Sequence, residues 1–346
     1  MKAVILEKVN GELLVGEVGL TDVSFGQVLV KVIMSGICGA QLQEIAGNKN
    51  NARFMPHLLG HEGCGIVEEV GVGVTKVKKG DKVVMHWRKG DGIESDFPKY
   101  TYNGNIISGG KVTTLSEYSI VSENRITPVP QDTPNELCAL LGCGLSTALG
   151  TVNEEANVKF GESVLIIGAG GLGVNLVTAA KLASAYPIII VDVTDSKKEI
   201  CESLGANLYI NCTTHNISSE IEKAFGITEI DVIIDTSGNK QSLEETIQLL
   251  SGTGRFIFVG QPKPGESVEL KNAVHLFEGD GKKIMATQGG GFSPGRQIAR
   301  YVRMHQAGVL SIEGIISHTM KLDDINEAIH LVRSGQAGRI MIELSS

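Results

Sequence analysis

Residues 164–192 read VLIIGAGGLGVNLVTAAKLASAYPIIIVD, and this stretch decides the fold. An apolar run is followed by a glycine turn, a helix-forming segment and a second apolar run that ends in Asp192. Gly168, Gly170 and Gly173 fit the pattern G-x-G-x-x-G. In that pattern the first glycine permits a tight turn, the second lets the backbone approach a pyrophosphate, and the third lets the helix pack closely on the sheet. The stretch predicts a strand–turn–helix–strand unit that binds a dinucleotide.

The carboxylate that ends this stretch indicates which dinucleotide is bound. An acid at this distance from the glycine turn accepts both hydroxyls of the adenosine ribose and disfavours a 2′-phosphate. The N-terminus of the helix offers unpaired N–H groups and a positive dipole end to the phosphates. Asp192 therefore predicts NAD rather than NADP. The glycines alone would also fit a tight strand–helix turn in another kind of α/β sheet.

Length, charge and cysteine usage narrow the class of protein. A chain of 346 residues is long enough for about two domains. The net charge of −8 and the lack of a basic stripe argue against a nucleic-acid partner. No apolar run approaches the ~20 residues of a membrane helix, and the N-terminus reads as a strand, so we expect a cytoplasmic protein. The six cysteines are scattered without a C-x-x-C pair, which favours reduced thiols.

The chain changes its pattern near residue 160. Before it, short alternating strands separated by charged or glycine turns predict a barrel or sandwich; they lie at 27–34, 65–70, 81–85 and 117–121. After it, apolar strands alternate with helices, which is typical of a parallel, doubly wound sheet. We expect those strands at 164–167, 188–191, 208–210, 231–235, 256–259 and 284–287, and helices at 196–204, 217–225 and 240–250. The tail predicts helices at 295–306 and 322–334 and a strand at 339–344.

Three glycine-flanked residues of the first part are candidate metal ligands. They are Cys38, His61 and Cys143. Each alone is more often a core or loop residue, but glycines let the backbone bend so that a short side chain can be aimed at a point. Two thiolates and one imidazole leave a fourth position open, and this ligand set is typical of a catalytic zinc site.

Together with the dinucleotide fold, these features make the chain resemble the medium-chain, zinc-dependent alcohol dehydrogenases. The likeness extends over nearly the whole length. It includes MKAV at 1–4, PHLLGHEG at 56–63, VKKGDKVV at 77–84, Cys143, the glycine turn and LVRSG at 331–335.

The resemblance implies a fold, an activity and an assembly. The fold is α/β, with a discontinuous GroES-like β-barrel catalytic domain at residues 1–150 and 288–346 and a Rossmann NAD-binding domain at 151–287. The activity is hydride transfer between NAD and an alcohol or polyol, or its aldehyde or ketone, with zinc polarising the substrate oxygen. Relatives are homodimers or homotetramers, and we expect the sheet edge near 256–259 to be a subunit contact.

The resemblance also assigns roles to individual residues. Cys38, His61 and Cys143 match the ligands of the catalytic zinc, and Glu62 matches an adjacent glutamate that can approach the metal. The residues that match cofactor contacts are Thr147, Gly168, Gly170, Gly171, Leu172, Gly173, Asp192, Lys197, Val259 and Arg339. Trp87 lies where relatives place an aromatic residue in the substrate pocket, and Arg88 follows it. If Arg88 and Lys89 face the substrate, an anionic or polyhydroxylated substrate is favoured over a simple alcohol.

Two departures from the family pattern affect these expectations. Many relatives begin a proton relay with a hydroxyl residue, where this chain has Ala40, and end it with a histidine, where this chain has Gln43. Many also support the zinc-bound histidine with an aspartate, where this chain has Gln41. The proton is then expected to pass to water, to Glu62 or to a second substrate hydroxyl. No cysteine lies between Met85 and Val121, where relatives bind a structural zinc, so we expect one zinc per subunit.

Two other functions fit parts of the sequence. One is a zinc-free, NADPH-dependent enone or quinone reductase of the same superfamily, although the three candidate ligands and Asp192 argue against it. The other is a non-catalytic dinucleotide-binding protein, which Ala40 and Gln41 make somewhat more plausible.

Overall fold

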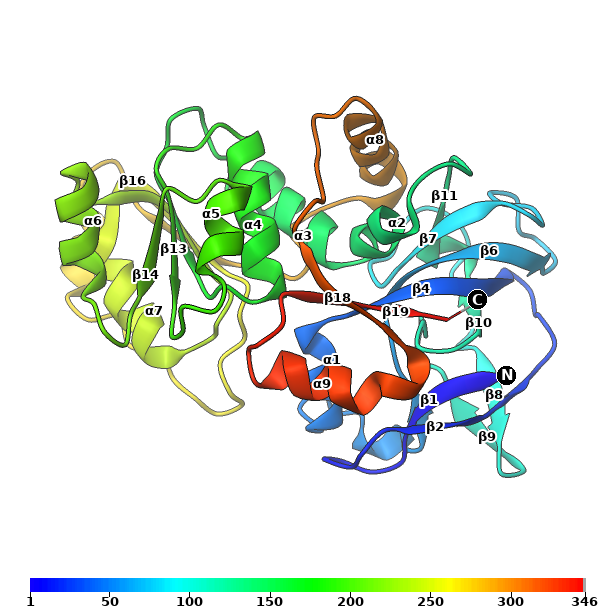
Figure 1. Ribbon diagram of the computed structural model, residues 1–346. Coiled ribbons are helices and arrows are strands. Elements are labelled where there is room, and N and C mark those ends of the chain that lie inside the picture. The colour runs from blue at the N-terminus through cyan, green and yellow to red at the C-terminus, as the bar shows by residue number, and fades with distance from the viewer. Residues whose placement is uncertain (345–346) are drawn as a thin grey trace. The chain divides into compact units, whose positions relative to one another are not determined.

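The computed structural model describes residues 1–344, which form two compact units (Figure 1). One unit, here called the barrel unit, contains Met1–Ser146 and the chain from Ser293 onward; the other, the Rossmann unit, is Thr147–Phe292. Among the described residues, no helix combines the length and the apolar character needed to cross a membrane.

The barrel unit contains two sheets. The six-stranded sheet has the order β2-β1-β5-β9-β8-β3. Its strands are β1 (Lys2–Leu6), β2 (Leu14–Glu17), β3 (Gly19–Leu20), β5 (His57–Leu58), β8 (Lys99–Tyr102) and β9 (Asn105–Ser108). Strands β8 and β9 form an antiparallel pair within the segment that lacks cysteines.

The seven-stranded sheet is built around β4 (Gln27–Ile37), which pairs with three other strands. The order is β11-β7-β6-β4-β19-β18, and β10 also pairs with β4. The remaining strands are β6 (Glu62–Val70), β7 (Lys82–His86), β10 (Tyr118–Ser122), β11 (Ile126–Val129), β18 (Ile316–Lys321) and β19 (Arg339–Glu343). Val28, Val30 and Val32 alternate along β4 into one core, as the period of a strand requires. The tail therefore completes this sheet, and Figure 1 shows β19 in red beside β4 in blue.

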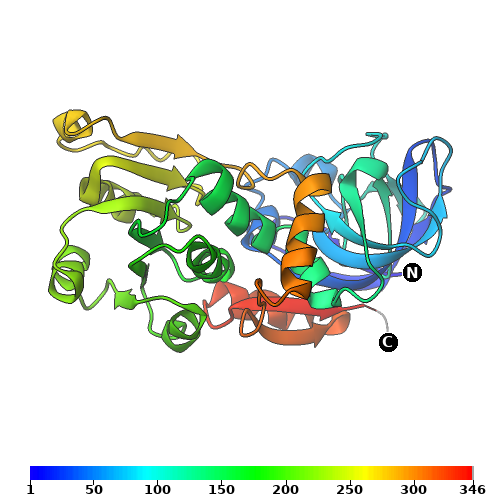
Figure 2. The ribbon, with the colours of Figure 1, turned by 90° about the horizontal axis from the view of Figure 1, so that it is seen from above.

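Helices cover parts of the barrel unit. They are α1 (Gly39–Ile45), α2 (Asn135–Leu141), α8 (Pro294–Gln306) and α9 (Ile325–Arg333), while α3 (Gly144–Gly150) runs on into the Rossmann unit. Helix α9 buries Ile325, Ala328 and Ile329, whose spacing of three and four residues places them on one face. That face packs into a core shared with β1 and β19. Figure 2 shows α8, in orange, alongside the barrel, where it contacts β11.

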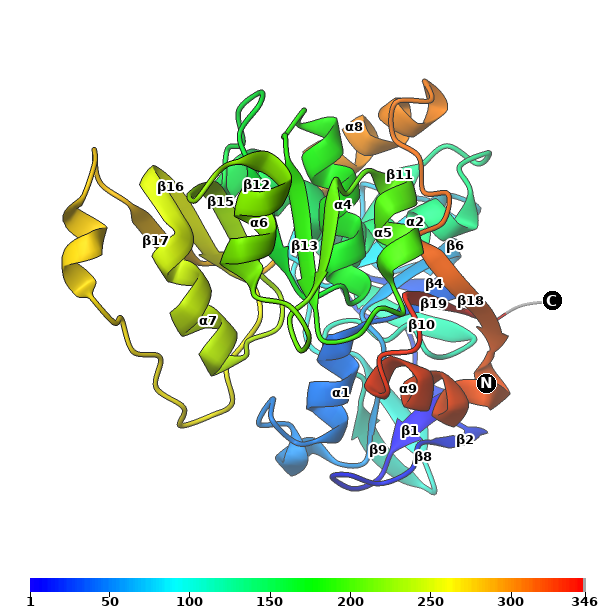
Figure 3. The ribbon, with the colours of Figure 1, turned by 60° about the vertical axis from the view of Figure 1, so that its left-hand side comes forward.

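The Rossmann unit is a parallel sheet with the order β14-β13-β12-β15-β16-β17 (Figure 3). Its elements are β12 (Val164–Ile167), α4 (Gly171–Leu182), β13 (Ile188–Asp192), α5 (Lys198–Leu204), β14 (Leu208–Asn211), α6 (Ile217–Phe225), β15 (Ile230–Asp235), α7 (Lys240–Thr246), β16 (Leu250–Phe258) and β17 (Lys283–Ala286). Relative to the chain this is the order 3-2-1-4-5-6 of dinucleotide-binding sheets. The predicted α/β fold with a doubly wound sheet is confirmed.

One expectation about this sheet is wrong. We placed an edge near residues 256–259, but β16 pairs with β15 on one side and β17 on the other. The edge strand is β17, which is short and mostly exposed. The hydrophobic pattern and the length of a strand do not reveal whether it lies at the edge of a parallel sheet. Its place depends on the order in which the strands pair.

The barrel unit also buries a histidine at the end of β7. The imidazole of His86 is fully buried; its Nδ1 lies 2.7 Å from the carbonyl oxygen of Arg88 and its Nε2 lies 2.9 Å from Oγ1 of Thr127. A neutral ring satisfies both contacts, with Nδ1–H donating to the carbonyl and the threonine hydroxyl donating to Nε2. Burial lowers the pKa of His86 to about 4.

This histidine is expected to make the fold sensitive to acid. His86 takes up a proton near pH 6.5 in the unfolded chain but only near pH 4 in the folded protein. The contribution of the neutral imidazole to the free energy of unfolding is therefore fully present above pH 6.5 and is lost as the pH falls from 6.5 to 4. The shift corresponds to a loss of about 3 kcal/mol. Urea unfolding between pH 7 and 4.5 should show a shallower decline for His86→Gln than for the parent chain, and parallel curves would contradict this.

Candidate functional site

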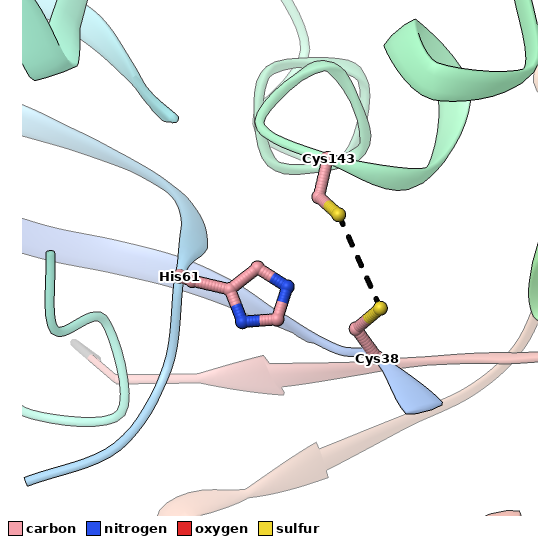
Figure 4. Close-up of side chains that lie close together, drawn as sticks. All are labelled: Cys38, His61 and Cys143. Carbon is pink, nitrogen blue, oxygen red and sulfur yellow. Dashed lines mark hydrogen bonds between the residues drawn. The ribbon is translucent and has the colours of Figure 1, made fainter. Parts of the chain in front are cut away.

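Three loops of the barrel unit bring Cys38, His61 and Cys143 together (Figure 4). Cys38 directly follows β4 and is the N-cap residue of α1. His61 directly precedes β6, and Cys143 directly precedes α3. The bend before His61 needs glycine, because Gly60 has a φ of +99° and a Cβ there would lie 2.6 Å from the backbone nitrogen of Leu115.

The spacing of the three side chains suits a tetrahedral metal. One ligand atom from each residue lies within 4.8 Å of the others, and the two sulfurs are 4.0 Å apart. Two thiolates on one tetrahedral zinc would be about 3.8 Å apart, whereas a disulfide needs about 2 Å. Among residues 1–344 this is the one group of three such side chains that could hold a metal ion.

The two thiols interact directly with each other. A hydrogen bond from Cys143 lowers the pKa of Cys38 well below its usual range, and the same contact raises the pKa of Cys143. The first thiolate therefore opposes ionisation of the second. A divalent cation between the two sulfurs would remove this conflict and let both act as ligands.

Behind the thiols lies a buried ion pair. Glu62 is fully buried and Arg339 is 3% exposed, and an Nη of Arg339 hydrogen-bonds both carboxylate oxygens of Glu62. The carboxylate also accepts the backbone N–H of Gly144 at 3.1 Å, and Arg339 donates to the carbonyl oxygen of Ile37 at 3.2 Å. Burial raises the pKa of Glu62, and the neighbouring guanidinium opposes that rise.

Counting these charges supports a divalent metal. When both thiols act as ligands, two thiolates and the Glu62 carboxylate would carry three negative charges, and Arg339 would return one positive charge. A doubly charged cation balances the remainder, as a buried site requires. The soft sulfur and imidazole donors favour zinc over magnesium or calcium. The residues present therefore fit the predicted metal.

Gln41 connects two of these ligands. Its Oε1 accepts the backbone N–H of Cys38 at 2.7 Å, and its Nε2 lies 3.2 Å from Nδ1 of His61. Nδ1 therefore faces α1, which leaves Nε2 of the imidazole for a metal. A histidine that binds zinc through Nε2 carries its proton on Nδ1 and needs an acceptor there. Gln41 has one side-chain oxygen for two donors, the N–H of Cys38 and the N–H of His61.

A carboxylate at residue 41 should hold zinc more tightly. Gln41→Glu keeps the side-chain length and supplies two acceptor oxygens, so both donors are satisfied. We expect zinc transfer to a chelator to slow by about tenfold, the lower end of the effect of such supporting groups. Gln43→Glu is the matched control, because Gln43 is exposed on the same helix and its side chain bonds Asn48. Equal zinc retention in both variants would contradict this role of Gln41.

The glycine turn of the Rossmann unit lies where the sequence predicts it. Gly168 has a φ of +95°, and Gly170 caps α4, whose first turn contains Gly171, Leu172 and Gly173. A Cβ on Gly173 would lie 1.8 Å from the carbonyl oxygen of Gly168, so a side chain there is excluded. The turn thus leaves the backbone and the α4 N-terminus open to a pyrophosphate.

Asp192 is held against this turn. Its Oδ2 accepts the N–H of Ala169 at 2.6 Å and its Oδ1 accepts the N–H of Val193 at 2.7 Å. Lys197 is 6% exposed, and burial lowers its pKa while Asp192 opposes the shift. The glycine turn, Asp192 and Lys197 thus lie close together, and their cofactor roles stay predictions.

The other predicted cofactor residues are more scattered. Thr147 is buried on α3, and Val259 follows β16 and donates its N–H to the carbonyl oxygen of Asp235 at 2.9 Å. Arg339 belongs to the barrel unit, where its side chain is occupied by Glu62. The cofactor roles of these three residues stay predictions.

A cavity of about 370 Å³ adjoins His61 in the barrel unit. Trp87 lines it, as predicted for the substrate pocket, whereas Arg88 is not among the described residues that line it. Sequence reasoning missed Glu44, His57, Lys111 and Arg125 in its wall. Only the Gly109-Gly110 pair before Lys111 could have pointed to a bend there.

Sequence comparisons agree with this geometry. Residues 24–131 match the alcohol dehydrogenase GroES-like domain, and residues 171–300 match the zinc-binding dehydrogenase domain. The chain is 29% identical to a protein of Synechocystis named S-(hydroxymethyl)glutathione dehydrogenase, over 99% of both chains. It is also 29% identical to alcohol dehydrogenase 6 of Peromyscus maniculatus, over 99% of this chain and 97% of that one.

Solved structures agree as well. An alcohol dehydrogenase zinc-binding domain protein from Burkholderia ambifaria has a TM-score of 0.90 and 25% identity, covering 100% of this chain and 99% of its own. Benzyl alcohol dehydrogenase from Acinetobacter calcoaceticus has a TM-score of 0.89 and 26% identity, covering 99% of both chains. These matches span both units and confirm the resemblance seen in the sequence. The chain belongs to the medium-chain, zinc-dependent alcohol dehydrogenase family.

Proposed function

We propose that this protein is an NAD-dependent dehydrogenase with one catalytic zinc, which interconverts an alcohol or polyol and the corresponding aldehyde or ketone. The observation that carries the proposal is the cluster of Cys38, His61 and Cys143, whose ligand atoms lie within 4.8 Å of one another. Zinc bound there supplies a Lewis acid that stabilises negative charge on a substrate oxygen.

The residues of the chain hold and orient the other components. The glycine turn at 168–173 and the N-terminus of α4 bind the pyrophosphate of NAD, and Asp192 binds the adenosine ribose with Lys197 beside it. Thr147 is proposed to contact the nicotinamide and Val259 another part of the cofactor, whereas the ion pair with Glu62 argues against a contact of Arg339 with the pyrophosphate. Trp87 provides an apolar wall for the substrate in the cavity beside His61.

The proton of the substrate hydroxyl needs an acceptor other than residue 40, because Ala40 has no hydroxyl. Glu62 is poorly placed for this task, since Arg339 and the N–H of Gly144 occupy its carboxylate oxygens. We therefore favour water or a second substrate hydroxyl. Glu44 is a further carboxylate in the cavity wall and joins the candidates.

The two rival functions make different demands on the site. A zinc-free, NADPH-dependent reductase needs neither the paired thiols nor a carboxylate at the ribose, and both are present. A non-catalytic dinucleotide-binding protein has no need of a ligand set that remains complete and closely spaced. These two features favour the dehydrogenase.

One assay separates the three functions. NADH formation is followed with sugars, polyols, sugar phosphates and simple alcohols, with and without a zinc chelator, on protein of measured metal content. We expect about one zinc per subunit and turnover with NAD that the chelator abolishes. The same protein is also given NADPH with an enone or a quinone, and oxidation of NADPH that the chelator leaves unchanged would support the reductase. Zinc and NAD binding without turnover on any substrate would support the non-catalytic protein.

Assembly and location are separate proposals. We propose a homodimer or homotetramer, which light scattering of the purified protein would distinguish from a monomer. We propose a cytoplasmic location on the basis of six cysteines that form no disulfide. Cell fractionation tests the location.

A further inference from the structure

The cavity beside His61 carries positive charge on part of its wall. Lys111 and Arg125 both line it, as does Trp87. Lys111 also stacks its ammonium group over the ring of Phe97, with 4.2 Å from Nζ to the ring centre. Two cations in one wall suit an occupant that carries negative charge.

A single carboxylate accompanies these cations. Glu94 lies 2.7 Å from Nζ of Lys111, 2.9 Å from an Nη of Arg125 and 3.4 Å from Nζ of Lys89. Burial alone would raise the pKa of Glu94, but hydrogen bonds from Lys111, Arg125 and Asn124 outweigh it and lower the pKa to about 2. One negative charge thus stands among three positive charges, so the cluster keeps a positive excess.

Of the two cations in the cavity wall, Lys111 is the better placed for a further acceptor. The Arg125 side chain is 11% exposed; one Nη donates to the carbonyl oxygen of Trp87 and the other to Glu94. Its Nε is buried and has no hydrogen-bond partner. Lys111 is 35% exposed, so its ammonium group retains room for another oxygen besides Glu94.

Besides His61 and the two cations, the cavity wall holds two further ionisable groups, His57 and Glu44. His57 is buried, with Nε2 2.8 Å from Nδ2 of Asn51 and Nδ1 2.8 Å from the carbonyl oxygen of Leu58. Glu44 is the one carboxylate among the described residues that line the cavity, and burial raises its pKa. Glu44 therefore gives up its proton less readily than an exposed glutamate.

We propose that the cavity selects alcohols that carry an anionic group, a carboxylate or a phosphate, with Lys111 binding the anion and Arg125 adding positive charge to the wall, while the reacting hydroxyl lies toward His61. This inference rests on the proposed dehydrogenase function. It extends that function by naming the substrate class. The Lys111 ammonium group can donate a charge-assisted hydrogen bond to a carboxylate or a phosphate oxygen.

The only tryptophan of the chain provides a binding test that does not depend on turnover. Trp87 lies in the cavity wall, so its fluorescence should respond to occupants. The zinc-loaded protein is titrated with glycerol, glycerate and glycerol 3-phosphate. We expect the two anions to bind about tenfold more tightly than glycerol, as a charge-assisted hydrogen bond implies, and their affinity to fall with added salt. The tighter of the two anions identifies the carboxylate or the phosphate as the preferred group.

Variants connect the binding to the named cation. Lys111→Gln should weaken glycerate and glycerol 3-phosphate by about tenfold, and Lys111→Arg should restore most of the affinity. Lys99→Gln is the control, because Lys99 is exposed on β8 and lies outside the cavity wall. An anion held by zinc alone would be insensitive to Lys111. If Lys111→Gln fails to fold, Lys111→Met removes the same charge with an unbranched side chain and is expected to weaken both anions equally.

The results distinguish the two proposals. Anions that bind no more tightly than glycerol, or that bind equally to Lys111→Gln, overturn the anion inference even if alcohols are oxidised. A protein that binds the anions through Lys111 but reduces NAD with no alcohol overturns the dehydrogenase function instead. Kinetic preference for glycerate or glycerol 3-phosphate over glycerol that falls in Lys111→Gln supports both.

Discussion

Cys143→Ser is expected to remove zinc from the protein and to lower kcat/KM for alcohol oxidation by about a thousandfold, because a Lewis acid is worth several kcal/mol to this reaction. A serine hydroxyl is a poor zinc ligand beside the thiolate that it replaces. The substitution also removes the contact between the sulfur atoms of Cys38 and Cys143, which lie 4.0 Å apart in the parent chain. Metal analysis by atomic emission and a standard NADH assay measure the two effects on the same sample.

The matched control is Cys212→Ser. Cys212 is a free, half-buried cysteine of the Rossmann unit and lies outside the ligand cluster. It should leave the zinc content near one per subunit and the turnover within twofold of the parent, as a substitution far from the site generally does. If Cys143→Ser kept its zinc and its activity, the assigned ligand set would be wrong. A loss of zinc without a loss of turnover would refute the role of the metal in the reaction.

The Rossmann unit was the most predictable part of the fold. Its strands are short apolar runs, and the helices between them end at recognisable turns, so each element is specified locally. The run at 217–225 coincides with α6, which Asn216 caps and Gly226 ends in a left-handed conformation. The lateral order of the strands is not local information, which is why the edge was placed at β16 instead of β17.

The metal cluster was predictable for a different reason. Cys38, His61 and Cys143 each stand beside glycines, and the resemblance to a known family identified which three residues belong together. Their approach within 4.8 Å depends on three separate loops of the barrel unit, so spacing along the chain could not have given it. The short motifs around these three residues, matched to a known family, predicted the metal site, whereas the hydrophobic periodicity of the sequence could not.

The charged surroundings of the site could not be read from the sequence. Lys111 and Arg125 are separated from Glu94 by strands and turns, and the contact forms only when β8 and β9 fold back. Such side chains are mostly exposed in proteins, and the sequence alone favours a solvated loop for each. We considered Arg88 and Lys89 for a charged pocket wall, whereas Lys111 and Arg125 line the cavity.

The largest effect on stability is expected at Arg339. Arg339→Met removes the partner of a fully buried carboxylate, and breaking such a pair costs about 3–5 kcal/mol because the remaining charge stays buried. Arg333→Met is the control, since Arg333 is an exposed residue of α9 and should cost less than about 0.5 kcal/mol. Urea unfolding of the zinc-loaded proteins near neutral pH measures both.

A second substitution decides whether the loss of stability comes from breaking the Glu62–Arg339 ion pair or from removing the arginine alone. Glu62 and Arg339 are 277 positions apart in the chain, so their contact forms only when β19 joins β4. Arg339→Met combined with Glu62→Gln leaves no charge behind, and the double variant should be more stable than Arg339→Met alone, because a neutral pair no longer pays the cost of an unpaired ion. If the two losses simply added, Glu62 and Arg339 would not be coupled. The ion pair would then be incidental to the stability of the barrel unit.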